Sequence, residues 1–185
     1  AAKAGRMDKL PLAVMQRTRL ATVTMSVNGK SITRTVESRM HLTDFLRNEL
    51  DLTGSHLGCE HGVCGACTVR VDGDIVRGCL VLAAQLEGAR VETIEGISAS
   101  GEIADLQEAF VRRNALQCGY CTPGMLMCAA ELLKTQPTTD RDAIREFISG
   151  NYCRCTGYHA IVDAIAQTVE ERQTARDQAE DIRGN

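Results

Sequence analysis

The chain has 185 residues, 44% hydrophobic and 24% charged, which is enough for one medium domain or two small ones. Its net charge of −3 excludes the basic surface typical of a DNA-binding protein. Aromatic residues make up only 3% and Trp is absent, which argues against a base-stacking platform for single-stranded nucleic acid.

Residues 1–19 form a basic N-terminal extension. Its apolar stretch, residues 10–15, is too short for a secretory signal, and no twin Arg precedes it. No run in the sequence approaches the roughly 20 apolar residues of a membrane helix. Most cysteines fall into compact groups with the spacing of metal ligands, which suits a reducing compartment. We therefore expect a cytoplasmic protein without a membrane span.

Residues 20–95 predict a small domain with a mixed sheet and one helix across it. The first two strands lie within residues 20–36, joined at Asn28-Gly29, a dipeptide typical of tight hairpins because both positions tolerate positive φ. An amphipathic helix follows at 41–50. Further strands are expected at residues 68–71, 75–76 and 91–94.

Residues 96–101 are rich in Gly and Ser and predict a linker, after which the hydrophobic period becomes helical. Thr122 and Thr139 are the predicted N-caps of the second and third helices of a four-helix domain at 102–172. A charged tail at 173–185 is either a solvated end or a partner contact. The four helices are expected at residues 105–115, 123–134, 140–149 and 159–172.

The first cysteine set has the C-x4-C-x2-C…C spacing of a plant-type [2Fe–2S] loop. Its members are Cys59, Cys64, Cys67 and Cys79. Three interspersed glycines allow backbone N–H groups to point at the sulfurs. A zinc site is the alternative, but zinc favours paired short elements over this spacing. His61 is disfavoured as a Rieske-type ligand, because four cysteines already suffice.

The second cysteine set consists of two short pairs, and its spacing alone fits zinc or a cluster. Its members are Cys118, Cys121, Cys153 and Cys155. Each pair directly precedes a predicted helix, whose N-terminal partial charge would offset an anionic centre. The neighbouring ferredoxin-like loop favours a second redox centre, since two such centres can pass electrons between them.

The remaining residues of chemical interest have ordinary structural explanations. Cys128 lies among apolar residues of a predicted helix and is expected to be a buried small hydrophobe. Three tyrosines near the second set are expected to shield it from water, namely Tyr120, Tyr152 and Tyr158. Three histidines have no partner pattern and are expected to be structural, namely His41, His56 and His159.

Three motifs together resemble the iron–sulfur subunit of molybdenum hydroxylases, the xanthine oxidase family. They are Gly58-Cys59-x4-Cys64-Gly65-Ala66-Cys67-Thr68-Val69, Gln117-Cys118-Gly119-Tyr120-Cys121-Thr122-Pro123-Gly124 and Gly150-Asn151-x-Cys153-Arg154-Cys155-Thr156-Gly157-Tyr158. The resemblance runs from about residue 20 to 170. It implies an α+β protein with a β-grasp ferredoxin-like domain followed by a four-helix [2Fe–2S]-binding domain.

The resemblance also implies roles for single residues. The first cysteine set would ligate the cluster nearer a flavin, and the second set the cluster nearer molybdenum. Gln117 and Cys155 match the family positions that approach the pterin of the molybdenum cofactor. No residue of this chain is expected to convert substrate, because it has no phosphate-binding loop and no candidate general base.

The partners implied are a large subunit with molybdopterin, as the cytosine dinucleotide, and a medium subunit with FAD, assembled as a dimer of heterotrimers. Electrons would pass from molybdenum through the two clusters to the flavin or another acceptor. A free-standing two-cluster ferredoxin is the alternative function, although such a carrier needs neither the helical domain nor Gln117. A zinc-binding interaction module is a third hypothesis. The substrate is not readable from this chain.

Overall fold

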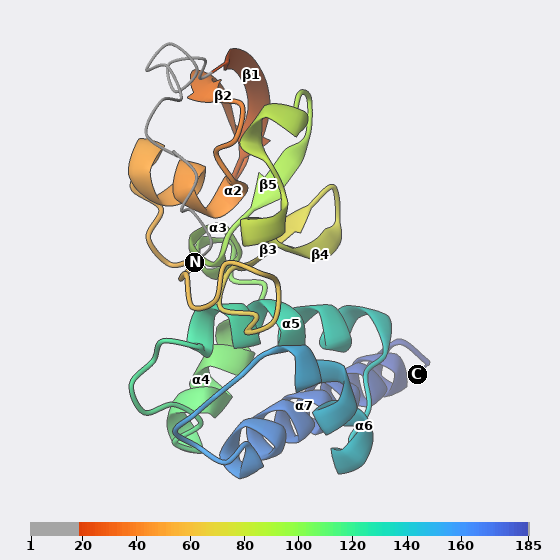
Figure 1. The fold of residues 1–185 in the computed structure, drawn as a ribbon. Helices are drawn as coiled ribbons and strands as arrows, with labels where there is room; N and C mark the ends of the chain where they lie inside the picture. Colours follow the sequence, from red (N-terminus) through yellow and green to blue (C-terminus); the bar gives the residue numbers. More distant parts are fainter. Residues whose placement is uncertain (1–18, 185) are drawn as a thin grey trace, which may run out of the picture.

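The computed structural model describes residues 19–184, which fold into a sheet domain and a helical domain stacked end to end (Figure 1). The predicted extension at 1–19 lies outside the described residues except for Arg19. Each domain has its own cluster of buried apolar side chains. Among the described residues, none of the helices combines the length and apolar character needed to cross a bilayer.

The sheet has five strands in the order β2-β1-β5-β3-β4. β1 pairs in parallel with β5, whereas the other neighbours are antiparallel, so the predicted mixed sheet is confirmed. Asn28 (φ 50°) and Gly29 (φ 78°) form the predicted hairpin turn. The strands are β1 (Leu20–Val27), β2 (Lys30–Glu37), β3 (Thr68–Val71), β4 (Asp74–Arg77) and β5 (Arg90–Glu92).

The helix predicted at 41–50 is present but changes its winding. It begins as α2 (Leu42–Asp44) and continues as a π-helical turn at Phe45–Glu49. Leu42, Phe45 and Leu46 are buried against the sheet. His41 caps the start, because its Nδ1 accepts a hydrogen bond from the Asp44 backbone N–H at 3.1 Å.

The prediction of a linker at 96–101 was wrong about the structure of this segment. Helix α3 (Ile94–Ala99) begins where the last strand was expected to end, and β5 stops at Glu92. Ile94 and Ile97 lie three residues apart and enter the core of the helical domain. Burial of this apolar face outweighs the low helix propensity of Gly and Ser.

The helical domain contains α4 (Ala104–Arg112), α5 (Thr122–Thr135), α6 (Arg141–Phe147) and α7 (His159–Gly184). The two predicted caps are each displaced by one residue. Cys121 occupies the cap position of α5, so Thr122 is already helical. Asp140 caps α6 instead of Thr139, because its carboxylate accepts from the N–H groups of Asp142 and Ala143 at 2.8 and 2.9 Å.

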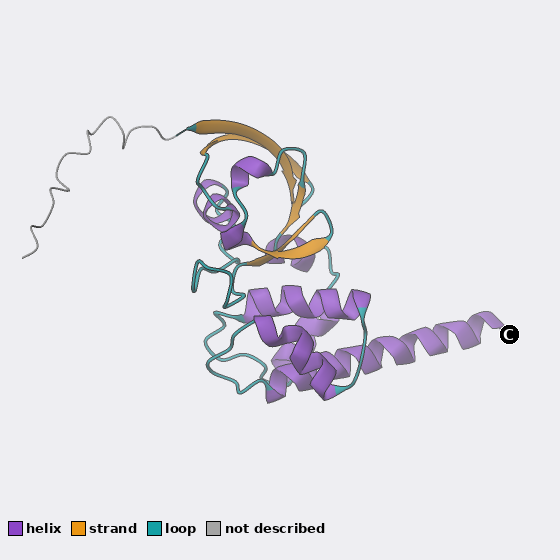
Figure 2. Ribbon diagram, turned by 45° about the vertical axis from the view of Figure 1, so that its right-hand side comes forward, coloured by secondary structure: helices purple, strands orange, loops and turns teal. Residues whose placement is uncertain are grey.

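Helix α7 is longer than expected. It was predicted to end near residue 172, but it continues through Gly184 and its last part projects away from the domain (Figure 2). Its buried residues end at Val169, and the described residues beyond it carry mostly charged or polar side chains on a solvated surface. Good helix formers such as Ala, Glu, Gln and Arg explain why the segment stays helical without packing.

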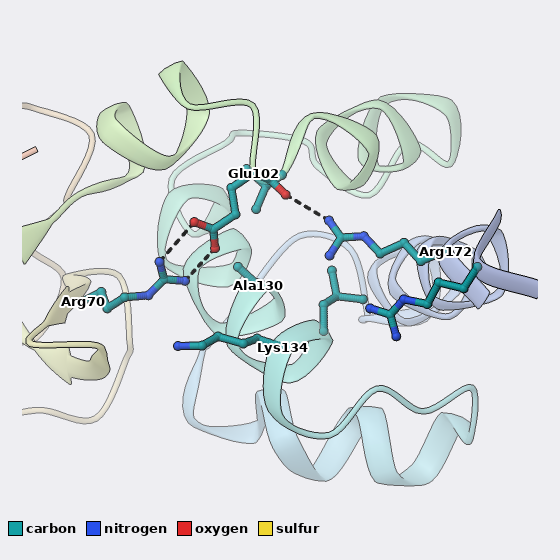
Figure 3. A pocket seen from close by; sticks show the side chains of 8 residues that line it. Arg70, Glu102, Ala130, Lys134 and Arg172 are labelled. Carbon is teal, nitrogen blue, oxygen red and sulfur yellow. Dashed lines mark hydrogen bonds and ion pairs between the residues drawn. The ribbon is translucent and has the colours of Figure 1, made fainter. Parts of the chain in front are cut away.

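An ion pair joins the two domains on one side (Figure 3). Arg70 of β3 is 4% exposed and donates to Glu102 at 2.8 and 3.2 Å. Arg70 also donates to Glu92, within the sheet domain, at 3.4 Å. Arg172 of α7 donates to the Glu102 carbonyl at 3.0 Å. Within the helical domain, Arg172 donates to Asp105 at 2.7 and 2.8 Å. The hydrogen bond from Arg70 lowers the pKa of Glu102, and that from Arg172 lowers the pKa of Asp105.

Candidate metal centres

The first cysteine set lies on the loop that connects the helix of the sheet domain to β3. This loop, residues 58–67, lies at the end of the sheet domain that faces α5 (Figure 1). Left-handed backbone at Glu60 (φ 55°), Gly62 (φ 83°) and Gly65 (φ 75°) curls the loop back on itself. Cys79 comes from the 3-10 turn Gly78–Leu80 directly after β4. The sequence prediction that these four residues gather at one loop is consistent with this placement.

Backbone N–H groups stabilise negative charge within this loop. The N–H of Cys64 lies 3.3 Å from the Cys59 sulfur. Hydrogen bonds from the backbone of His61 and then Cys64 lower the pKa of the Cys59 thiol to about 6. Burial and then the neighbouring Cys67 thiol raise the pKa of Cys79 to about 11. A cationic iron pair would supply the positive charge that buried thiolates need.

One glycine of this loop is required for space and another for its left-handed backbone, since the Leu80 methyl beside Gly62 belongs to an exposed side chain that can move. A Cβ on Gly58 would lie 2.9 Å from the Cys64 sulfur, inside van der Waals contact. A Cβ on Gly62 would lie 2.5 Å from Cδ1 of Leu80, in addition to its left-handed φ. The predicted role of glycine in closing the backbone around the sulfurs therefore has a steric basis.

The second cysteine set is assembled from two distant segments. Cys118 and Cys121 lie directly before α5, and Cys153 and Cys155 lie in the loop before α7. The sulfurs of Cys155 and Cys118 are 3.6 Å apart, although 37 residues separate them. As the sequence indicates, both pairs precede a helix N-terminus.

Burial differs within the second set. Desolvation and then a hydrogen bond with Cys153 raise the pKa of the Cys121 thiol to about 12. Burial also acts on Cys153, but hydrogen bonds with Thr156 outweigh it and lower the pKa of Cys153. Cys118 and Cys155 are exposed. One edge of this set therefore faces solvent while the other faces the domain core.

In each set the thiols approach one another two by two. Cys59 contacts Cys64, and Cys67 contacts Cys79. In the second set, Cys118 contacts Cys155 and Cys121 contacts Cys153, and all eight thiols are free. Within residues 19–184, no three His, Cys, Asp or Glu side chains are arranged to share one metal ion. Two ligands for each of two irons is how a [2Fe–2S] cluster divides its four ligands, so the donor sets fit this group.

Hydrogen bonds hold the loop before α7 in shape. The backbone N–H of Cys153 donates to the Tyr158 hydroxyl at 2.8 Å, and Thr156 Oγ1 lies 3.2 Å from the Cys153 sulfur. Tyr158, with φ 68°, is half-buried as a shielding residue would be. Tyr152 is 55% exposed, so its side chain stays largely in contact with solvent.

Tyr120 has a different role from the one predicted for the tyrosines. Its ring stacks on His56 with centroids 4.5 Å apart, and its hydroxyl donates to the Leu57 carbonyl at 2.6 Å. Tyr120 therefore links the second cysteine set to the segment before the first one. His56 takes part in this contact, as a structural histidine would.

The residues expected to approach a pterin lie on one exposed edge. Gln117 is exposed and directly precedes the exposed Cys118, whose sulfur is close to that of Cys155. Leu116 beside them is 37% exposed. Cys128, by contrast, is buried within α5, and burial raises its pKa to about 11, as expected for a cysteine that packs as a hydrophobe.

Two family models match the chain, one for each domain. A "2Fe-2S iron-sulfur cluster binding domain" covers residues 25–94, and a "[2Fe-2S] binding domain" covers residues 93–166. The gamma subunit of caffeine dehydrogenase from Pseudomonas sp. (strain CBB1) is 48% identical over 83% of this chain and 94% of its own length. The small subunit of nicotine 6-hydroxylase from Paenarthrobacter nicotinovorans is 52% identical over 77% and 86%, respectively.

Solved structures agree with these relatives. A chain of quinoline 2-oxidoreductase from Pseudomonas putida 86 superposes with a TM-score of 0.77, at 50% identity over 82% of this chain and 94% of that one. The chain belongs to the family of small iron–sulfur subunits of molybdenum hydroxylases. It corresponds to 17% of the aldehyde oxidoreductase chain from Desulfovibrio gigas, with a TM-score of 0.76.

Membership of this family confirms the main sequence predictions. The fold is α+β, with a ferredoxin-like domain followed by a helical domain. The small subunit serves electron transfer within a heteromeric oxidoreductase and carries two [2Fe–2S] binding domains. Sequence reasoning included Asn151 in the third motif but gave it no role, because its burial and its contact with Gly65 depend on the tertiary structure.

Proposed function

We propose that this chain relays electrons through two [2Fe–2S] clusters, one held by Cys59, Cys64, Cys67 and Cys79 and the other by Cys118, Cys121, Cys153 and Cys155. The observation that carries the proposal is the two-by-two approach of eight free thiols within two separate sets. Residues 20–95 and 102–172 would be the two cluster-binding domains, and the free thiols suit a cytoplasmic, reducing environment.

A direct backbone contact connects the two sets. The N–H of Tyr152 donates to the carbonyl of Cys64 at 2.8 Å. Cys64 belongs to the first set, and Tyr152 is covalently bonded to Cys153 of the second. A through-bond route between the sets therefore contains a single hydrogen bond, which supports transfer of one electron at a time from one cluster to the other.

The exposed edge of the second set is the proposed entry for electrons. Gln117 would hydrogen-bond the pterin of a molybdopterin cofactor on a large partner subunit, and Cys155 would lie next to it. When bound, the molybdenum cofactor supplies the oxidation of substrate and two electrons. The first set would deliver them to FAD on a medium subunit, within a dimer of heterotrimers with molybdopterin cytosine dinucleotide.

Analysis of the purified complex tests the clusters and the partners separately. We expect about four iron and four acid-labile sulfide per copy of this chain, and co-purification of two larger subunits. About two zinc without sulfide would overturn the cluster proposal in favour of a zinc module. A monomer with both clusters and no stable partner would favour the free-standing ferredoxin.

Substitution of Gln117 tests the entry edge. Gln117→Ala should slow substrate-driven reduction of the clusters, while iron and sulfide contents stay at the wild-type level because Gln117 ligates no metal. The matched control is Gln107→Ala, which makes the same Gln-to-Ala change in α4, away from both cysteine sets. Unchanged reduction kinetics in Gln117→Ala would remove this residue from the site.

A further inference from the structure

A buried contact ties the first cysteine loop to the segment before Cys153. The carbonyl of Gly65 accepts hydrogen bonds from the Thr68 hydroxyl at 2.6 Å and from the side-chain amide of Asn151 at 3.1 Å. Thr68 and Asn151 are each only 1% exposed. Gly65 lies next to Cys64, and Asn151 lies two residues before Cys153. The Gly65 carbonyl thus accepts hydrogen bonds from a residue next to the first cysteine set and from a residue next to the second.

The Gly65 carbonyl also lies against the segment that follows Cys121. A Cβ on Gly124, in the first turn of α5, would lie 2.3 Å from the Gly65 carbonyl oxygen. A Cβ on Gly65 would lie 2.7 Å from the amide carbon of Asn151. Backbone therefore packs on backbone here with no room for a side chain. We call Gly65, Gly124 and Asn151 the junction of the three cysteine segments.

Arg77 connects this buried contact to the segment that carries Cys79, the member of the first set outside the loop. It lies two residues before Cys79, donates from Nη2 to the Gly150 carbonyl at 2.8 Å, and donates from Nη1 to the Thr68 hydroxyl. The Asn151 amide reaches the same hydroxyl at 3.5 Å. Each segment that carries a cysteine of either set therefore contacts this small buried group of residues.

We infer that Asn151 is a positioning residue for electron transfer, whose side-chain amide fixes the spacing between the two clusters. The inference rests on the proposed function, since it requires both clusters. In the step concerned, one electron leaves the second cluster, which is oxidised, and enters the first, which is reduced; no bond is made or broken. Because the rate of such transfer falls steeply with distance, a shift of one loop against the other slows it.

The Asn151 amide is suited to this role because its removal lowers the free energy of unfolding by more than the loss of a surface hydrogen bond does. Its donor is buried against an acceptor, so its loss leaves the Gly65 carbonyl without one of its partners. Asn151→Asp keeps the shape but cannot donate when ionised, and it places a carboxylate oxygen against a carbonyl oxygen. Asn151→Ala removes the contact and leaves a cavity between the loops.

The test uses the whole complex with its partner subunits, reduced by dithionite or by substrate. We expect Asn151→Ala and Asn151→Asp to slow electron arrival at the first cluster by roughly 10-fold or more, the size typical of outer partners of metal ligands. The magnetic interaction between the two reduced clusters, read from low-temperature EPR spectra, should weaken at the same time. Thr68→Val, a milder change at the same carbonyl, should shift both readouts in the same direction.

Two controls separate positioning from general stability and from the proposed function. Leu106→Ala opens a cavity in α4, in the same domain, and should leave the magnetic interaction at its wild-type strength. Because a core cavity in α4 can also lower the content of the second cluster, the magnetic interaction is compared only for molecules that retain both clusters. Wild-type transfer rates and wild-type magnetic interaction in Asn151→Ala would overturn the inference, as would an equal weakening of the interaction in Leu106→Ala. Absence of clusters from the wild-type chain would instead refute the proposed function.

Discussion

The two cysteine sets are built in different ways. The first is mainly one loop, in which glycines and left-handed residues curl the backbone and its own N–H groups point at sulfur. The second joins residues 37 positions apart, in the segments that precede α5 and α7. The first buries Cys67 and Cys79, whereas the second leaves Cys118 and Cys155 on the surface.

This difference bears on the direction of electron flow. A site closed by its own loop needs little else to hold its cluster, while a site assembled from helix ends depends on the packing of its domain. The exposed edge of the second set is open to a partner, and the backbone contact between Tyr152 and Cys64 leads from there to the first set. Four experiments, with five substitutions, test this comparison.

The largest effect is expected from Cys121→Ser. Loss of one proposed ligand should abolish the EPR signal of the second cluster and stop substrate-driven reduction of the first, since electrons then have no route between them. Dithionite should still reduce the first cluster directly. Cys128→Ala is the matched control, because Cys128 belongs to neither set, and it should keep the full iron content. Normal substrate turnover in Cys121→Ser would contradict the relay.

A pair of core substitutions tests whether each set depends on its own domain. Phe45 and Phe110 are both buried, one in the sheet domain and one in the helical domain. Each change to Ala should lower the free energy of unfolding by about 3–5 kcal/mol. Spin quantitation should find less of the first cluster in Phe45→Ala and less of the second in Phe110→Ala. Equal losses of both clusters in both variants would show that the domains do not act separately.

Glu102→Gln tests the ion pair between Arg70 and Glu102, which joins the two domains. The pKa of Glu102 is lowered in the folded state, chiefly by the hydrogen bond from Arg70, so its carboxylate stabilises the fold above its unfolded pKa. Because Glu102 is partly exposed, we expect a loss of about 1–2 kcal/mol at neutral pH.

The pH dependence supplies the check on this variant. The difference in unfolding free energy between wild type and Glu102→Gln should shrink as pH falls below about 4.3, where the unfolded carboxyl becomes protonated. Denaturant titrations at several pH values would measure it. A difference that does not change with pH would mean that the charge of Glu102 contributes nothing.

The smallest effect is expected from Tyr120→Phe. Removing the hydroxyl that donates to the Leu57 carbonyl should lower the free energy of unfolding by about 0.5–1 kcal/mol, because the stacking on His56 is kept. Both EPR signals should be unchanged. Loss of the second cluster in this variant would mean that the tyrosine holds the cysteine segment in place rather than linking it to its neighbour.

The hairpin at Asn28-Gly29, the two domains and the grouping of eight cysteines into two sets could be predicted from the residues alone. These features depend on local physics: positive φ at a turn, apolar period, and ligand spacing within short segments. The predicted N-cap residues, which require the helix start to be placed to a single residue, were less accurate. Both helix caps moved by one residue. At α6 the reason is that the Asp140 carboxylate accepts from two backbone N–H groups, whereas at α5 Cys121 occupies the cap position without a side-chain cap bond.

Three other features depend on contacts between segments that are distant in the chain. The Gly- and Ser-containing segment 96–101 lies largely in a helix because Ile94 and Ile97 find a core to enter. Which thiols of the second set approach each other depends on how the helical domain brings the segments before α5 and α7 together. The role of Asn151 depends on a carbonyl 86 residues earlier in the chain, and no local pattern specifies a contact of that separation.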